Sequence, residues 1–219
     1  MIPLLDPSFH DDSIFIATSD AFQEITTKSV LSDGSGVKTL TEPLLVWIDA
    51  VGNRIMQDTM STNEISPVAH SLCKLTVAFG DLASAYLAYN ISSSMPVPTS
   101  PTTPPTTKGH LTQNFLRLLL AYTGLRGYYG VDEDESEMTL GFWYLFQEAL
   151  WSTDYFIDGG GDNQSSPRPE SGEIRESKQV LMAKAVYSEL VQVLRRKVAF
   201  PPPGSGWSRG SYLFCLDIF

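Results

Sequence analysis

The stretch Tyr122–Trp151 reads YTGLRGYYGVDEDESEMTLGFWYLFQEALW, and it predicts two helices joined by a short turn. The apolar run before Gly124 and Gly127 predicts the end of one helix, because glycine is favoured just past a helix C-terminus. The run that follows places apolar residues at helical spacing. Each helix is too apolar to stand alone, so the pair predicts a helical hairpin that needs neighbours. The expected buried stripe of the second helix comprises Leu140, Phe142, Trp143, Tyr144, Phe146, Gln147 and Leu150.

The turn between these two helices is rich in acidic residues. Ser136 is the expected N-cap of the second helix, and carboxylates near a helix N-terminus are stabilised by the helix dipole. Acid–base catalysis by paired carboxylates needs a pocket and perturbed pKa values, which an exposed turn does not provide. The turn is therefore interpreted either as a solvated helix start or as a contact surface for a basic partner. Its acidic residues are Asp132, Glu133, Asp134, Glu135 and Glu137.

Composition indicates a folded, acidic protein. The 219 residues are 42% hydrophobic, which is enough for a continuous core in one domain or in a stretch of a repeat array. Lys plus Arg number 15 and Asp plus Glu number 25, so the formal net charge is −10. The only dense basic cluster, Arg195–Lys197, ends a predicted helix, where cations complement the helix dipole. We therefore expect no direct contact with nucleic acid.

The two cysteines, Cys73 and Cys215, are too few and too far apart for a disulfide framework or a zinc site. They fit a reducing compartment. The first residues show no signal-peptide pattern, and no stretch approaches the ~20 consecutive apolar residues of a membrane span. We expect a soluble intracellular protein that does not contact membranes.

Short motifs with catalytic associations lack the sequence context that those functions need. The segment Gly206–Gly210 matches a nucleophile elbow around Ser208, but three prolines precede it and no histidine follows. Gly159–Gly161 lacks the preceding strand and the following Lys-Ser/Thr of a phosphate-binding loop. The histidines are not part of a spaced metal-ligand motif, and His70 lies in a helix with a core-type apolar pattern, so we expect structural roles for them and no enzyme activity, no cofactor and no metal. The histidines are His10, His70 and His110.

Six helices are predicted, and no segment alternates in the manner of a strand. The third helix has Ser66 as its expected N-cap and Pro67 at its first position. This helix is apolar on two sides, which indicates that it lies between neighbours in stacked helical layers. The second helix is expected to have Pro43 in its first turn. The predicted helices are 12–31, 40–60, the one after Ser66, the two of the central hairpin, and 173–198.

Aromatic and aliphatic residues at helical spacing form the expected core. Trp47, Phe79, Trp143 and Tyr187 are the large side chains assigned to it. The last helix is expected to face inward through seven residues. They are Val180, Ala183, Tyr187, Leu190, Val191, Leu194 and Val198.

Two low-complexity segments separate the predicted helices. Residues 92–108 are rich in Pro, Ser and Thr, and residues 158–172 are rich in Gly, Ser and Pro, so neither can bury a core. We interpret them as disordered insertions in a helical section 1–203, followed by an irregular tail 204–219. The order of helix pairs is compatible with an all-α solenoid of about three HEAT-like hairpins, or less well with a closed six-helix bundle.

Three segments resemble importin-13-type karyopherins of the importin-β superfamily. The central TGLRGYYGVDEDESEMTLGFWYLFQEAL resembles that family's T-G-x-x-G-x-Y-x-V-(D/N)-E…S-x-x-T-L-x-F-W-Y-x-L-Q segment. Cys73–Asp81 resembles its C-R-I-A-x-A-x-G-E helix. Val186–Leu194, with Lys197, Phe200 and Pro201 after it, resembles its Y-x-x-L-V-x-V-L…K-x-x-F-P helix end.

The resemblance implies HEAT repeats without catalysis, acting between nucleus and cytoplasm in protein transport governed by the small GTPase Ran. It implies basic cargo proteins and Ran as partners, with nuclear pore proteins as further partners. The repeats that mainly bind Ran in this superfamily lie outside the matched section. Because GSGWSRGSYLFCLDIF after Pro203 departs from the family, we expect a truncated section of a longer receptor. The alternatives are a solenoid scaffold without a transport function and a hydrolase acting through Ser208.

Overall fold

The computed structural model describes residues 5–7, 11–28, 35–97, 106–127, 133–152 and 178–197. This part of the chain is mostly helical and contains no strand beyond one isolated β-bridge, so the predicted all-α class is confirmed. No helix within it is long and apolar enough to cross a lipid bilayer. The predicted insertion 158–172 and the tail 204–219 lie outside the described residues.

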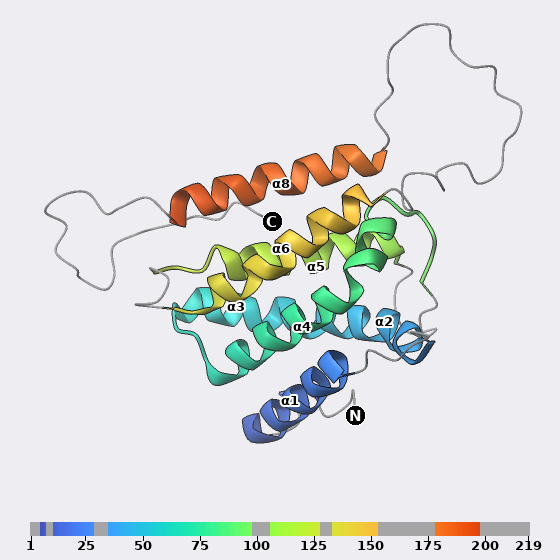
Figure 1. The fold of residues 1–219 in the computed structure, drawn as a ribbon. Helices are drawn as coiled ribbons and strands as arrows, with labels where there is room; N and C mark the ends of the chain where they lie inside the picture. Colours follow the sequence, from blue (N-terminus) through green and yellow to red (C-terminus); the bar gives the residue numbers. More distant parts are fainter. Residues whose placement is uncertain are drawn as a thin grey trace, which may run out of the picture.

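Six helical segments occur in the described part of the chain, in agreement with the predicted number (Figure 1). The second of them is one continuous run that contains a π-helical stretch. In chain order the segments are α1 (Asp12–Lys28), α2 (Ser35–Trp47) running through η2 (Ile48–Gly52) into α3 (Asn53–Thr62), α4 (Pro67–Asn90), α5 (Lys108–Thr123), α6 (Glu135–Trp151) and α8 (Lys178–Lys197).

Several helix ends lie where local residue preferences place them. The Ser66 hydroxyl oxygen accepts a hydrogen bond from the Ala69 N–H at 3.1 Å, and Pro67 is the first residue of α4. Helix α5 ends before Gly124, as predicted. Gly127 then adopts a φ of 103°, a backbone conformation that residues with a side chain rarely take.

The second predicted helix begins earlier than its sequence pattern indicates. Helix α2 starts at Ser35, so Pro43 lies inside it and not in its first turn. Proline has no N–H and therefore leaves one helical hydrogen bond unmade. The neighbouring Leu44 and Leu45 are each 1% exposed, and this burial stabilises the helix through the proline.

The Pro/Ser/Thr-rich insertion is shorter than the predicted range 92–108. Pro96 and Thr107 form an antiparallel β-bridge, and two backbone hydrogen bonds of 2.9 Å join the two sides of this base. Lys108 already belongs to α5. The prediction was wrong at both ends because backbone pairing orders residues whose composition alone indicates disorder. Residues 98–105, the middle of the insertion, lie outside the described residues.

The helices follow one another in two rows. Helix α4 lies between α1 and α6, with which it makes its most extensive contacts. Helix α5 contacts the α2–η2–α3 run as well as α8. The rows are therefore α1–α4–α6 and α2/α3–α5–α8, with α1 and α8 at opposite ends of the molecule (Figure 1). The expectation that the third helix lies between two neighbours is confirmed.

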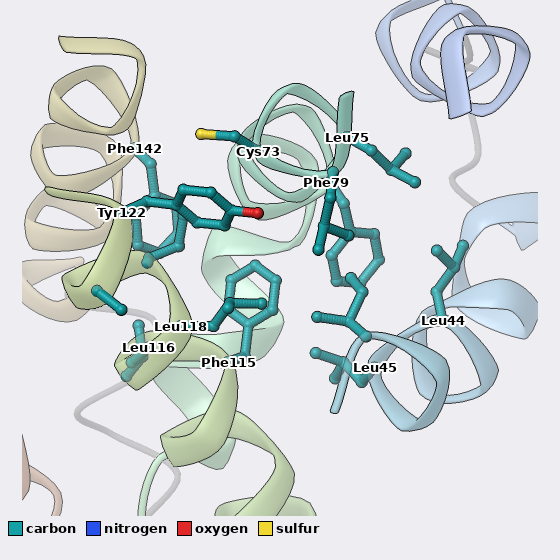
Figure 2. Packing of buried hydrophobic residues seen from close by; sticks show 14 of the residues in the cluster. Leu44, Leu45, Cys73, Leu75, Phe79, Phe115, Leu116, Leu118, Tyr122 and Phe142 are labelled. Carbon is teal, nitrogen blue, oxygen red and sulfur yellow. The ribbon is translucent and has the colours of Figure 1, made fainter. Parts of the chain in front are cut away.

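Aromatic rings from three helices form the centre of the core. Phe115 of α5 makes edge-to-face contacts with Phe79 of α4 and Phe142 of α6, at centroid distances of 5.7 and 6.0 Å (Figure 2). Gly80 allows α4 and α6 to approach closely, because a Cβ at this position would lie 2.7 Å from the Phe142 ring. Packing around these rings sets the separation of α4, α5 and α6.

Three of the four large side chains assigned to the core are buried. Trp47, Phe79 and Trp143 are at most 8% exposed, which confirms the prediction for them. Tyr187 is only partly buried. Its ring stacks on Phe146 at 6.3 Å between centroids, and its hydroxyl donates to the Trp143 carbonyl at 2.7 Å. Tyr187 therefore attaches α8 to the outer part of α6.

The buried stripe of α6 is narrower than predicted. Phe142, Trp143, Phe146 and Leu150 are buried. Leu140 and Tyr144 are 44% and 63% exposed, and Gln147 is exposed as well. Because α6 ends its row, only the side chains that face α4, α5 and α8 are covered, and the predicted inward positions of these three residues were wrong.

Helix α8 likewise buries a single narrow stripe. Leu190 and Val193 are its buried residues. Val191, predicted to face inward, is 62% exposed because α8 contacts α5, and α6 through Tyr187, on one side only. Val198, the last residue of the predicted inward set, lies outside the described residues.

Candidate functional site

The acidic turn extends into the first turn of α6 and has both buried and exposed members. Glu133 and Glu135 are only 6% and 3% exposed. Asp134 and Glu137 are exposed, and Asp132 lies outside the described residues. The interpretation of the turn as fully exposed is therefore wrong for two carboxylates. They are buried because side chains from α4 and α8 cover them, which no local pattern indicates.

Glu133 forms a buried ion pair with Lys197, the last residue of α8. Lys197 Nζ lies 2.5 Å from Glu133 Oε1, and the two side chains are 13% and 0% exposed. The same ammonium group donates to the carbonyl oxygens of Leu125 at 2.8 Å and Gly127 at 3.0 Å. Lys197 thus joins the end of α8 to both sides of the turn between α5 and α6. One cation of the predicted basic cluster therefore has a structural role.

Glu133 also caps α6. Its Oε2 accepts from the Ser136 N–H at 2.8 Å, and its Oε1 accepts from the Ser136 hydroxyl at 2.6 Å. A carboxylate in this position satisfies a free N–H and is stabilised by the helix dipole. Helix α6 begins at Glu135 with Asp134 as its N-cap, so the prediction of Ser136 as N-cap was wrong. Ser136 lies inside the first turn because the Glu133 side chain takes the capping role.

Glu135 connects the start of α6 to α4. Its Oε1 lies 2.7 Å from His70 Nδ1, and its Oε2 accepts from the Asp134 N–H at 3.1 Å. The Glu135 side chain is 4% exposed, whereas that of His70 is 45% exposed. The structural role assigned to His70 from the sequence is consistent with this contact. The partner itself could not be identified, because it lies 65 positions away.

Cys73 lies one turn beyond His70 on α4, and its Sγ is 3.9 Å from the Glu135 carbonyl oxygen. Burial raises the pKa of the Cys73 thiol well above its ordinary value, and the Glu135 and Glu133 carboxylates raise it further. A neutral thiol is a poor nucleophile. Cys73 is therefore a packing residue, in agreement with its apolar helical context in the sequence.

A groove of about 290 Å³ lies between the start of α4 and the start of α6. The N-termini of α4 and α6 adjoin this groove. The carboxylates of the turn therefore balance the positive ends of the two helix dipoles. Asp134 is the exposed carboxylate of this groove. The groove is lined by Ile65, Ser66, Pro67, His70, Glu133, Asp134 and Glu135.

The arrangement is suited to contact with a cationic side chain. Glu133 and Glu135 already accept hydrogen bonds from the chain's own donors, whereas Asp134 and Glu137 extend into solvent. In the part of the chain that the structure describes, no group of three or more His, Cys, Asp or Glu side chains could hold a metal ion. The sequence motifs around Gly159 and Ser208 lie outside that part.

Comparison of the chain with protein-family models, curated proteins and solved structures gave no match in any of the three.

Proposed function

We propose that this chain is a HEAT-repeat section of a nuclear transport receptor similar to importin-13-type karyopherins, which binds cargo protein and/or Ran. The observation that carries the proposal is the order of helix contacts. In an α-solenoid each helical hairpin contacts only the hairpins before and after it. The chain order fits three such hairpins, α1 with α2–α3, α4 with α5, and α6 with α8. The contacts of α1 with α4 and α2 with α5 join the first hairpin to the second, and those of α4 with α6 and α5 with α8 join the second to the third.

The three segments that carry the family resemblance also contact one another, which supports the same proposal. Cys73–Asp81 lies in α4 and faces α6, the helix of the central segment. The third segment includes Tyr187, which packs on Trp143 at 6.3 Å between ring centroids. Lys197 contacts the acidic turn directly. The described residues of the three segments thus form one connected part of the fold.

Asp134 and Glu137 are the proposed contact residues for a basic partner. Both are exposed, Asp134 lines the groove, and the chain as a whole carries a formal charge of −10. Electrostatic attraction of this kind accelerates association and makes it sensitive to salt. Glu133 and Glu135 act indirectly, because their buried contacts hold the turn in place.

The test measures binding of the purified chain to a fluorescent Lys/Arg-rich peptide and to purified core histones, with and without Ran locked in its GTP form. We expect binding that decreases with salt and changes when Ran is added. The double variant Asp134→Lys/Glu137→Lys should weaken binding roughly 3- to 10-fold. The matched control is Asp58→Lys/Glu189→Lys, which makes the same charge change at exposed positions outside the turn.

The outcomes separate the alternatives. Equal weakening by both double variants would refute a contact at the turn and would leave only an effect of net charge. Binding that ignores Ran would contradict the transport proposal and would favour a scaffold.

A further inference from the structure

Exposed apolar side chains are concentrated on α6 and α8. Of the eleven large hydrophobic residues that are exposed in the described part of the chain, six lie on these two helices. Both helices lie at the end of their rows, away from α1 (Figure 1). Exposed apolar side chains gathered on neighbouring helices mark sites of protein association. The six residues are Leu140, Tyr144, Leu145, Trp151, Leu181 and Val191.

The two helices also carry opposite charge. Helix α6 has no Lys or Arg, and it exposes Glu137 and Glu148 on the same face as Leu140 and Tyr144. Helix α8 contains five cations and one acidic residue, Glu189, in a chain whose formal net charge is −10. A second copy of the chain is repelled over most of the surface, but α8 offers it a basic, partly apolar face. The exposed cations of α8 are Lys178, Lys184, Arg195 and Arg196, whereas Lys197 is paired with Glu133 of the same copy.

The direction of the two helices fixes how such faces can pair. Lys197 lies beside Glu133 and Tyr187 lies beside Trp143, so α8 runs antiparallel to α6. A twofold axis parallel to both helices places α6 of one copy over α8 of the other, without a shift along the helix direction.

This symmetry brings complementary side chains to the same level. At ~1.5 Å of rise per residue, Leu140 of one copy lies about level with Val191 of the other, and Glu137 lies about level with Arg195. Val191 and Arg195 are four residues apart and share one face of α8. Each apolar pair and each ion pair occurs twice, because a twofold interface is self-complementary.

We infer that two copies of this chain associate through the outer faces of α6 and α8, with α6 of each copy on α8 of the other. The inference goes beyond the proposed transport function. It places Glu137, a proposed contact for a basic partner, against Arg195 of the second copy, so the dimer and the basic partner compete for this side chain. Apolar contacts supply the attraction, and the opposite charges of the two helices determine the orientation.

The first measurement is the molar mass of the purified full chain, by sedimentation equilibrium over a wide concentration range at low and high salt. We expect a monomer–dimer equilibrium whose dissociation constant rises with salt. A monomer at every concentration would overturn the inference. Open-ended growth to larger species would also overturn it, because a twofold interface stops at two copies.

Variants then locate the interface. Leu140→Asp and Val191→Asp should each raise the dimer dissociation constant by about tenfold or more, because each buries a carboxylate in the apolar contact. Ile14→Asp is the matched control, since Ile14 is 41% exposed on α1 at the other end of the rows. Circular dichroism checks that every variant is folded. An equal effect of the Ile14 variant would refute the assignment of the interface to α6 and α8.

A charge exchange tests the orientation. Glu137→Arg and Arg195→Glu should each weaken the dimer, because each places like charges opposite one another. The double variant Glu137→Arg/Arg195→Glu should restore the dimer, since opposite charges again face each other. Failure of the double variant to recover would overturn this pairing of the helices.

Discussion

Replacement of Lys197 by Met should destabilise the folded chain, because it removes a buried cation and keeps the aliphatic part of the side chain. The change eliminates the ion pair with Glu133 and the hydrogen bonds to the Leu125 and Gly127 carbonyls. Removal of one partner from a buried ion pair costs about 3–5 kcal/mol. Glu133 retains two hydrogen bonds from Ser136, so we expect about 2–3 kcal/mol.

The assay is urea unfolding followed by far-UV circular dichroism. With a urea dependence of ~2 kcal/mol/M, a loss of this size lowers the midpoint by about 1 M. The matched control is Arg196→Met, which removes an adjacent cation that is exposed. Its effect should stay below about 0.5 kcal/mol.

A double-mutant cycle with Glu133→Gln isolates the interaction itself. The double variant should be less destabilised than the sum of the single variants, by about 1–3 kcal/mol, because the second change removes a partner that is already missing. Two results would refute the reasoning: strictly additive single effects, or a Lys197 variant no less stable than the Arg196 control.

Further predictions concern Gly80 and Cys73 of α4 and Gly141 of α6. Gly80→Ala should destabilise the chain by about 1–3 kcal/mol, because its Cβ would lie 2.7 Å from an atom of the Phe142 ring. The Cβ of Gly141→Ala would meet nothing within 4 Å, so this variant should stabilise α6 by up to about 1 kcal/mol. The urea midpoints of the two variants measure both effects. Cys73 should resist thiol reagents in the folded Cys215→Ser variant, since burial raises its pKa. For the same reason stability should fall as pH rises above about 9, where the unfolded thiol ionises and the folded one does not. A Cys73→Ala variant that shows an identical pH dependence would contradict this assignment.

Features that depend on neighbouring residues were predictable from the sequence. Ser66 and Pro67 marked the start of α4, and Gly124 marked the end of α5, because caps act through the backbone within one turn. The apolar pattern on two sides of α4 also indicated neighbours on both sides.

Features that depend on distant residues were not predictable. Glu133 and Glu135 belong to a run of acidic residues, a pattern that predicts solvent exposure. In the structure Glu133 contacts Lys197, which is 64 positions away, and Glu135 contacts His70, which is 65 positions away. Likewise, the preference of proline for the first turn of a helix predicts that the helix begins near Pro43. The helix begins earlier, at Ser35, and the burial of the residues next to Pro43 stabilises it. Such contacts appear only when the rows of helices are in place.

The β-bridge between Pro96 and Thr107 has a practical consequence for engineering the chain. It holds the end of α4 and the start of α5 together whatever peptide connects them. The entropic cost of closing a loop rises only slowly with the length of the loop, by about 0.6 kcal/mol for each doubling. A short epitope or a fluorescent reporter sequence inserted within residues 98–105 should therefore leave the helical rows intact. That position offers an internal label for imaging the protein in cells without altering either α6 or α8.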